Sequence, residues 1–325
     1  MMIVVTPNLC IDRTHWLDHF EPGTVNRPRR ALVTAGGKGV NVARALRDLG
    51  RAPAVLGYRP AEGGDQVERL LRGEGIEPSL VDAPGELRSA IIVVEDSGRA
   101  TVLNEPGPTL DAAHRNALLD RVAERLSASG AQLVIGSGSL PPGLPADTYA
   151  ELCRTAREHG AQIIVDSARD ALTAVLGAEP DLVTPNLAEA EGLASGIVVE
   201  SSDHAEDRGE IRERAQLAAR SLRAAGARRA VVTAGAHGAA YADERSELWF
   251  DAPAVAAVNP IGAGDAFVGG VADHLASGAG WADAVRRGVL VASAAVEHPH
   301  AGRVDPARVS QLIAETGRPG RGHVA

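Results

Sequence analysis

Short apolar segments alternate with longer segments of helical periodicity along most of the chain. The β-rich segments cover residues 3–6, 54–58, 132–138, 162–166, 181–186 and 229–235. Stretches rich in Ala, Leu and Arg separate them, which predicts βαβ units and an α/β fold with a mainly parallel sheet flanked by helices. Ligands of such sheets bind beyond the carboxyl ends of the strands. Small or polar residues stand at several of these ends: Ser137, Gly138, Asp166, Asn186, Thr233 and Gly235.

Two stretches break this alternation and predict β-hairpins. The clearer one covers approximately 88–105, where two β-rich arms flank Asp96-Ser97-Gly98, and the other covers approximately 12–35. Both lie close in sequence to a glycine-rich stretch. We therefore expect them to form a small β-sheet lid that covers a site.

The size of the chain predicts one large domain. Its 325 residues, 45 % of them apolar, are enough to bury a sizeable core, and we expect a single domain over residues 1–325. Within it, residues 199–210 are acidic and lack apolar periodicity, which predicts a solvated connection. At the end of the given sequence, we expect residues 317–325 to form a flexible tail.

The charge and the cysteines narrow the class of protein. A net charge of −9 and an aromatic content of 3 % argue against a nucleic-acid partner, although a local site can still bind a small phosphorylated ligand. Cys10 and Cys153 lack the spacing of a disulfide framework or a zinc site, which fits a reducing compartment. The start shows no signal-peptide pattern, and no apolar run approaches the ~20 residues of a membrane span. We expect a cytoplasmic protein without a membrane partner.

The stretch TAGGKGVNVARAL, residues 34–46, contains the only lysine of a chain that has 32 arginines. Lys38 stands between Gly37 and Gly39, where a compact ammonium fits between closely approaching backbones better than a planar guanidinium does. Bare glycines on both sides favour a cradle for a ligand. A solvated lysine just before a helix is the alternative interpretation.

A second glycine-rich stretch, NPIGAGDAFVGG at residues 259–270, predicts a turn that leads into a helix. Four amides would then crowd the helix N-terminus, those of Gly262, Ala263, Gly264 and Asp265. Such a terminus attracts anions and stabilises developing negative charge. A carboxylate beside it suits phosphoryl transfer to an alcohol, because it can accept the hydroxyl proton. Helix capping alone is the alternative explanation for Asp265.

Three other catalytic patterns are absent from the sequence. Neither glycine stretch is a Walker A sequence, because Gly39 rather than Ser or Thr follows Lys38. The first predicted strand leads into TPNLCID rather than into G-x-G-x-x-G. The segment GSGSLPPG does not place a serine at the centre of G-x-S-x-G, which excludes a serine-hydrolase elbow.

Together, the two glycine stretches resemble the signatures of the ribokinase-like carbohydrate kinases, the pfkB family. AGGKGVNVARAL is similar to the first signature and GAGDAFVGGV to the second. Further matches follow in order through nearly the whole chain: TPNLCID, GSGSLPPGLP, VDSARDAL, TPNLAEAE and TAGAHGA. TPNLCID, Lys38 and GSGSLPPG look most like the branch that phosphorylates sugar phosphates, which includes 1-phosphofructokinases and tagatose-6-phosphate kinases.

The resemblance implies a Rossmann-like core with a β lid, and ATP and Mg²⁺ in the site. For the sugar phosphate it implies Asp12, Gly36, Gly37, Lys38, Asn41, Arg88, Ser137 and Gly138, with Arg88 on the phosphate already present. For the nucleotide it implies Asn186, Thr233, Gly235 and Gly238, and for magnesium Glu189 with Asn186, through water. Asp265 would be the catalytic base, beside the amides of Gly262, Ala263 and Gly264.

Several of these residues have a purely structural alternative. Asp12 can turn the chain after the first strand, and Arg88 can be a solvated charge on an edge strand. Asn186 and Glu189 can form a capping box, a local role that is compatible with metal binding. The HPH stretch at residues 298–300 suggests a metal only faintly, and we interpret it as loop histidines for want of further ligands.

Three residues depart from the family pattern. Thr184 stands where the family often has Lys before Pro-Asn, and Pro260 stands where Thr or Val is more usual. Ala90 stands where the sugar-phosphate branch often has Asn. These changes leave the acid and the amides intact, but they leave the identity of the sugar open.

These observations predict an ATP-dependent kinase that phosphorylates a hydroxyl of a ketohexose phosphate, such as fructose 1-phosphate or tagatose 6-phosphate, by in-line transfer. Two alternatives stay open: a kinase of an unphosphorylated sugar or nucleoside, and a sugar-phosphate-binding regulator without catalysis. We also expect a homodimer that forms through the β lid. The hypothesis requires Lys38 and Asp265 to open into one pocket.

Overall fold

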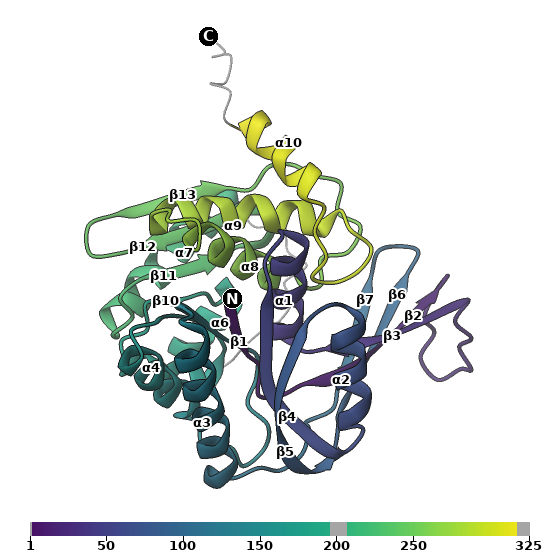
Figure 1. Ribbon diagram of the computed structural model, residues 1–325. Coiled ribbons are helices and arrows are strands. Elements are labelled where there is room, and N and C mark those ends of the chain that lie inside the picture. The colour runs from purple at the N-terminus through teal and green to yellow at the C-terminus, as the bar shows by residue number, and fades with distance from the viewer. Residues whose placement is uncertain (1, 196–206, 317–325) are drawn as a thin grey trace, which may run out of the picture.

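The computed structural model describes residues 2–195 and 207–316, and its central feature is a nine-stranded sheet. The strand order is β13-β12-β11-β10-β9-β8-β1-β4-β5 (Figure 1). Strands β11 to β5 of this order pair in parallel, and β12 and β13 continue the sheet antiparallel. The bounds are β1 Met2–Val5, β4 Pro53–Glu62, β5 Glu77–Glu86, β8 Leu133–Ser137, β9 Gln162–Asp166, β10 Leu182–Val183, β11 Ala230–Thr233, β12 Gly238–Ala242 and β13 Glu247–Asp251.

Helices cover both faces of this sheet, because its central strands are apolar on both sides. In β1, Ile3 and Val5 face the layer of α3 to α7, whereas Met2 and Val4 face α1, α2, α8 and α9. Helix α10 packs outside α9. The bounds are α1 Lys38–Asp48, α2 Gly64–Gly73, α3 Ala112–Ser129, α4 Thr148–Glu158, α5 Arg169–Leu176, α6 Leu187–Ser195, α7 Arg208–Ala224, the 3₁₀ turn η1 Gly235–His237, α8 Ala263–Leu275, α9 Trp281–Val296 and α10 Pro306–Thr316. The predicted α/β fold class is confirmed.

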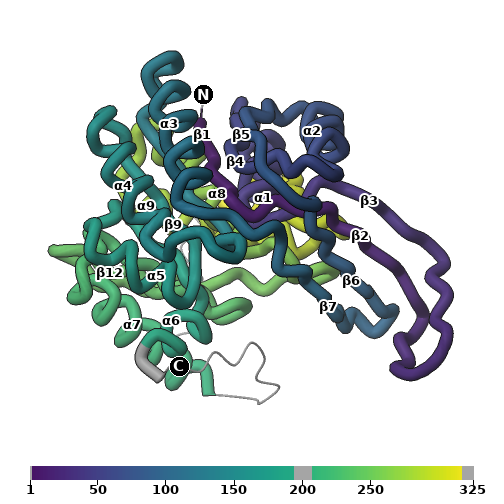
Figure 2. The backbone as a smooth tube through the Cα atoms, turned by 90° about the horizontal axis from the view of Figure 1, so that it is seen from below, coloured from purple at the N-terminus to yellow at the C-terminus, as the bar shows by residue number. Residues whose placement is uncertain are grey.

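A second sheet of four strands projects from the α/β body (Figure 2). Its order is β3-β2-β6-β7, with the bounds β2 Cys10–Leu17, β3 Arg30–Gly36, β6 Ser89–Glu95 and β7 Ala100–Asn104. Strand β2 pairs antiparallel with β3 and parallel with β6, and β6 and β7 form a hairpin. Because β2 follows β1 closely and β3 leads directly into α1, this sheet is joined to the core beside the first glycine stretch.

The sequence pattern does not indicate three of the strands. Strand β5 is rich in proline and charge because most of its side chains reach solvent at the sheet edge, and β12 and β13 are short and antiparallel. The predicted connection at 199–210 is wrong at its end, since residues 208–210 are the first turn of α7. The Asp207 side chain caps that turn by accepting the amides of Gly209 and Glu210.

Two further predictions concern residues outside the described part of the chain, namely 199–206 and the tail at 317–325. They stay predictions. Among the helices that the structure describes, none combines the length and the apolar character that crossing a membrane requires.

Candidate active site

A cavity of about 900 Å³ lies between the carboxyl ends of the parallel strands and the four-stranded sheet. Strands β9 and β11 contribute Asp166 and Thr233 to its wall, and β6 contributes Ala90 and Ile92. The predicted site residues on the wall are Asp12, Gly37, Lys38, Asn41, Arg88, Gly138, Asn186, Glu189, Thr233, Gly262, Ala263, Gly264 and Asp265. Lys38 and Asp265 therefore open into the same cavity, although they lie at opposite ends of the chain.

Asp265 lies in the first turn of α8. Gly262 begins this helix with a φ of 81°, and a Cβ there would lie 2.7 Å from the amide nitrogen of Gly302, so the turn requires glycine. The Asp265 side chain is buried, and its Oδ2 accepts a hydrogen bond from Nδ2 of Asn41 at 2.8 Å. Burial raises the pKa of Asp265 above its usual range, and the carboxylate of Asp166 raises it further. A carboxyl with a raised pKa suits proton acceptance near neutral pH.

Lys38 is the first residue of α1, and its ammonium is held by two carboxylates. Nζ lies 3.2 Å from Oε1 of Glu189 and 3.7 Å from Oδ2 of Asp166. These partners, Asp166 above all, hold the pKa of Lys38 well above its ordinary value, so the side chain stays charged. The flanking backbone is tight: Gly37 has a φ of 111°, and a Cβ on Gly39 would lie 2.6 Å from Cβ of Thr6. This close approach supports the cradle interpretation.

Asp166 is a candidate functional residue that the sequence analysis does not assign. It is buried at the end of β9, where its carboxylate accepts the hydroxyls of Ser137 and Thr184, both at 3.4 Å. Burial raises the pKa of Asp166, and the ammonium of Lys38 opposes that shift. The available signal is an acid at the end of a predicted apolar strand, since ligands of parallel sheets bind there.

Asn186 and Glu189 cap α6 reciprocally. The amide of Glu189 donates to Oδ1 of Asn186 at 2.8 Å, and the amide of Asn186 donates to Oε2 of Glu189 at 3.0 Å. Because Oε1 of Glu189 faces Lys38, the cap and the cavity use different oxygens. Among residues 2–195 and 207–316, the structure contains no group of three His, Cys, Asp or Glu side chains that could hold a metal ion. This includes the histidines at 298–300. A metal ion at Glu189 would therefore need water or substrate oxygens as further ligands.

Arg88 precedes β6, and its guanidinium lines the cavity. Nε and Nη2 donate to the carbonyl oxygen of Asn8 at 3.2 and 2.8 Å, and Nη1 donates to that of Glu105 at 3.3 Å. Within the described part of the chain Arg88 forms no ion pair, so backbone carbonyls fix its position without neutralising its charge. Asp12, on the same wall, accepts the Cys10 thiol at 3.2 Å, and burial raises the pKa of this carboxyl.

Two predicted substrate residues, Gly36 and Ser137, lie behind the cavity wall rather than on it. Gly36 leaves room for Asp12, since a Cβ on Gly36 would lie 2.0 Å from Oδ1 of Asp12. Ser137 is fully buried and donates its hydroxyl to Asp166. Both residues support a carboxylate on the wall.

Two predicted nucleotide residues, Gly235 and Gly238, also lie off the wall. Gly238 has a φ of 129°, and a Cβ there would lie 2.1 Å from the carbonyl oxygen of Phe250, so it packs against β13. Gly235 has a φ of 55° and open space around its Cβ position, so it shapes the turn that follows β11. The structure does not bring these two glycines to the cavity wall.

The three residues that depart from the family pattern, Ala90, Thr184 and Pro260, all line the cavity. At position 184 a neutral hydroxyl, rather than an ammonium, faces Asp166. Lys38 supplies the positive charge beside that carboxylate instead.

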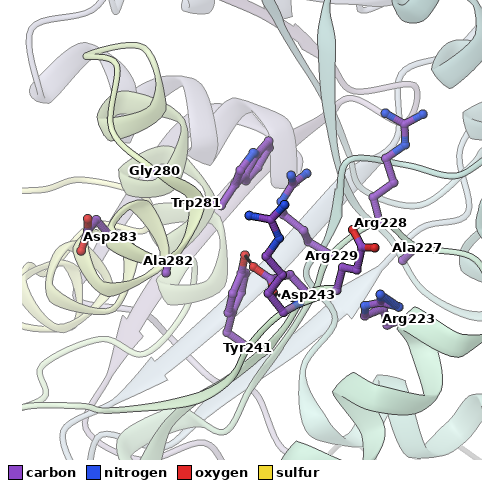
Figure 3. Close-up of a pocket in the computed structure, with 12 residues that line it drawn as sticks. Arg223, Ala227, Arg228, Arg229, Tyr241, Asp243, Gly280, Trp281, Ala282 and Asp283 are labelled. Carbon is purple, nitrogen blue, oxygen red and sulfur yellow. Dashed lines mark hydrogen bonds between the residues drawn. The ribbon is translucent and has the colours of Figure 1, made fainter.

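A separate cavity of about 750 Å³ lies at the amino end of β11, beside the start of α9. Figure 3 shows the arginines Arg223, Arg228 and Arg229 there, and the guanidinium of Arg229 lies 4.5 Å from the centre of the Trp281 ring. None of the predicted site residues lines this cavity. The candidate active site is therefore the cavity that contains Lys38 and Asp265.

Comparisons with known proteins identify the family of the chain. The model of the pfkB family carbohydrate kinases matches residues 2–308. The 1-phosphofructokinase of Xanthomonas campestris pv. campestris is 35 % identical over 278 residues, 84 % of this chain and 83 % of the relative. The tagatose-6-phosphate kinase of Staphylococcus epidermidis is 28 % identical over 277 residues, 85 % of each chain. The phosphofructokinase-2 of Escherichia coli in complex with fructose-6-phosphate matches with a TM-score of 0.81 at 27 % identity, over 98 % of this chain and 99 % of that one. The chain belongs to the pfkB family of carbohydrate kinases.

Proposed function

We propose that this protein transfers the γ-phosphoryl group of ATP to a hydroxyl of a ketohexose phosphate, with Asp265 as the base. The observation that carries the proposal is that Lys38 and Asp265, from the two glycine stretches, face one cavity. The relatives include 1-phosphofructokinases and tagatose-6-phosphate kinases. Fructose 1-phosphate and tagatose 6-phosphate are therefore the leading acceptors.

In this proposal Asp265 accepts the proton of the acceptor hydroxyl as the oxygen attacks phosphorus. Asn41 occupies Oδ2 of Asp265, which leaves the other carboxylate oxygen for that proton. The amide of Ala263 donates to the carbonyl oxygen of Pro260 at 3.3 Å, whereas those of Gly264 and Asp265 have no backbone acceptor among the described residues and can stabilise the charge of the transferring group. Transfer is in line, without a covalent enzyme intermediate.

The acceptor would be held by groups that differ in charge. Arg88 would bind the phosphate already on the sugar, because its guanidinium lacks a carboxylate partner among the described residues and can form charge-assisted bonds. Asp12 would bind sugar hydroxyls, and the backbone at Gly37 would let the sugar approach closely. Gly36 would contribute by making room for Asp12.

The donor side fits ATP with Mg²⁺. A cavity of about 900 Å³ leaves room for a nucleotide beside a sugar phosphate. Asn186 and Thr233 line this side, and the turn at Gly235 and Gly238 would border the nucleotide. Mg²⁺, when bound, neutralises phosphate charge, and Glu189 with Asn186 would hold it through water, as the oxygen donors and the lack of a closed ligand cluster among the described residues suggest.

Coupled measurement of ADP release with a panel of acceptors tests the proposal. A ketohexose phosphate should give the highest kcat/KM of the panel. Equal or better turnover of an unphosphorylated sugar or a nucleoside would indicate a kinase of that acceptor instead. Binding of a sugar phosphate without any ADP release would favour a regulator that lacks catalysis.

Replacing Arg88 by Met tests the class of acceptor. We expect kcat/KM for the sugar phosphate to fall by about 10–100-fold, because a hydrogen-bonded charge contributes roughly 1.5–3 kcal/mol. Turnover of an unphosphorylated sugar should hardly change. Arg72→Met is a matched control, since Arg72 is an exposed arginine of α2 whose one ion-pair partner within the described ranges is Glu68. Equal losses on both kinds of acceptor would remove Arg88 from the phosphate role.

We also propose that the four-stranded sheet joins two copies of the chain. One row of side chains across this sheet consists of Val33, Arg13, Ile91 and Leu103. Its apolar members are exposed: Val33 by 37 %, Ile91 by 38 % and Leu103 by 54 %. An apolar row on an exposed sheet suits self-association. A tetrameric form of the phosphofructokinase-2 of Escherichia coli is known.

Ile91→Glu should convert the proposed dimer into a monomer, because the new charge would be buried against its copy. Light scattering of the native chain and the variant measures this directly. Leu217→Glu is the control: Leu217 is 58 % exposed on α7, which lies at the opposite end of the molecule from the four-stranded sheet (Figure 2), and the change should leave the dimer intact. A monomeric native chain would contradict the proposal.

A further inference from the structure

Arg44 is a buried charged residue for which the proposed function has no role. It lies one turn after Asn41 on α1 and is only 5 % exposed. Its guanidinium forms a bidentate pair with Glu74, from Nε to Oε2 at 2.5 Å and from Nη2 to Oε1 at 2.7 Å. Nη2 also donates to the carbonyl oxygen of Ala35, and Nη1 donates to Oδ1 of Asn41 at 2.8 Å.

This arrangement determines how the side-chain amide of Asn41 is oriented. An amide has an oxygen that only accepts and a nitrogen that only donates, whereas a guanidinium only donates. Arg44 can therefore face only Oδ1, which turns Nδ2 toward Asp265, to which it donates at 2.8 Å. A flipped amide would place its oxygen against the Asp265 carboxylate and its nitrogen against a second donor.

Water cannot readily replace these contacts, because all three side chains are buried. Arg44, Asn41 and Asp265 are 5, 7 and 6 % exposed. Glu74, which is partly exposed, anchors the outer end of the series. Hydrogen bonds thus run continuously from Glu74 after α2 to the first turn of α8.

We propose that Arg44 is a positioning residue, which orients the amide of Asn41 and through it holds the carboxylate of Asp265 for proton acceptance. The inference rests on the proposed function of Asp265 as base. A donor bond to the ionised carboxylate favours that form and fixes the side chain in one orientation. Arg44 does not touch the acceptor in this role.

Other charges also face Asp265. Asp166 and Asp12 make its ionisation less favourable, and Lys38 makes it more favourable. The charge of Arg44 is balanced by Glu74 at bonding distance. We therefore expect Arg44 to act mainly through the orientation of Asn41 rather than through its own field.

Arg44→Met, Asn41→Ala and the double variant test the proposal. Arg44→Met should lower kcat about tenfold, since misplacing a catalytic group has a large effect, while KM for ATP changes little. The acid limb of kcat/KM should move to higher pH. The double variant should be no slower than Asn41→Ala alone, because both changes remove the same bond. Additive losses in the double variant, or an unchanged acid limb in Arg44→Met, would overturn the proposal.

A second readout does not depend on activity. The side-chain amide of Asn41, assigned in ¹⁵N–¹H spectra by its loss in Asn41→Ala, should exchange slowly with solvent in the native protein. Exchange should accelerate at least tenfold in Arg44→Met. Unchanged protection of this amide would contradict the proposed orienting contact.

Two further variants separate positioning from stability. Arg44→Met leaves Glu74 without its partner, so Arg44→Met/Glu74→Met removes both charges and should retain the fold while showing the same acid-limb shift. Arg51→Met is the matched control: Arg51 pairs with Asp273 of α8 at 2.7 Å and does not contact Asn41, so the acid limb should not move. If Asp265→Asn stays active, the proposed function fails. If Asp265→Asn loses activity but Arg44→Met behaves like the native protein, the inference on Arg44 fails and the proposed function stands.

Discussion

Replacing Asp265 by Asn is expected to lower kcat by on the order of 10³-fold, which is typical of the loss of a general base. An Asn side chain has nearly the same shape and its oxygen can still accept the hydrogen bond from Asn41, but it cannot take up the proton of the acceptor hydroxyl. Affinity for ATP should change little, because the change leaves the amides of α8 in place. ADP release measures the turnover, and calorimetric titration measures the binding of ATP.

The same variant should be at least as stable as the native protein at about pH 8, because the folded state holds the Asp265 proton more tightly than the unfolded chain does. Ionising Asp265 therefore costs stability as the pH rises through its raised pKa, and Asn removes that cost. The gain should shrink as the pH falls below the raised pKa and disappear only near the ordinary pKa of an unfolded aspartate, about 4. Melting curves of both proteins across this pH range check the sign. Near-normal turnover of a folded variant would remove Asp265 from the role of base.

The sequence predicts the parallel core because buried parallel strands are apolar on both faces. The segments at 132–138 and 162–166 contain β8 and β9. The apolar pattern does not identify β5 as a strand, because an edge strand that contains Pro78 and Pro84 resembles a loop in sequence. Strand β12 is built largely of small residues that no periodicity distinguishes. The pattern also does not predict the first turn of α7, because the apolar positions of this helix begin only at Ile211, after the Asp207 cap.

The sequence predicts the position of a site residue where the motif itself defines the local backbone. Each glycine stretch begins a helix, so Lys38 and Asp265 could be placed at helix N-termini. The partners of these residues could not be predicted, because the contacts of Lys38 with Asp166 and of Asn41 with Asp265 depend on how distant elements meet. Backbone packing also separates residues of one motif, as Gly36 lies behind the wall that its neighbour Gly37 lines.

Replacing Lys38 by Met is expected to lower kcat by on the order of 10²-fold, the effect of removing one preorganised group that stabilises transition-state charge. The ammonium lies beside Glu189 and Asp166, whereas Arg88, on the same cavity wall, has no carboxylate partner among the described residues. We therefore expect Lys38 to act on the transferring group and Arg88 on the phosphate of the acceptor. Initial rates at varied sugar phosphate separate kcat from KM.

The loss of Lys38 should also make stability more dependent on pH. Its charge opposes the raised pKa of Asp166, so without it that pKa rises further and ionising the carboxyl costs more. Lys38→Met should therefore lose more stability in mildly alkaline than in mildly acidic solution. A melting temperature that falls equally at both would place Lys38 in packing rather than in charge balance.

Lys38→Arg is the sharper comparison, because it keeps the charge and changes only the shape of the group that carries it. The backbone that carries the side chain is tight, because Gly37 and Gly39 flank Lys38 and a Cβ on Gly39 would lie 2.6 Å from Cβ of Thr6. A planar guanidinium is wider than an ammonium and has a different hydrogen-bonding geometry, so we expect the Arg variant to recover less than about a tenth of native kcat. Recovery of native kcat would mean that the position needs only a charge, and a chain with 32 arginines would then have no steric reason to keep its single lysine here. A raised KM for sugar phosphate at unchanged kcat in Lys38→Met would instead assign the ammonium to uniform binding of the acceptor.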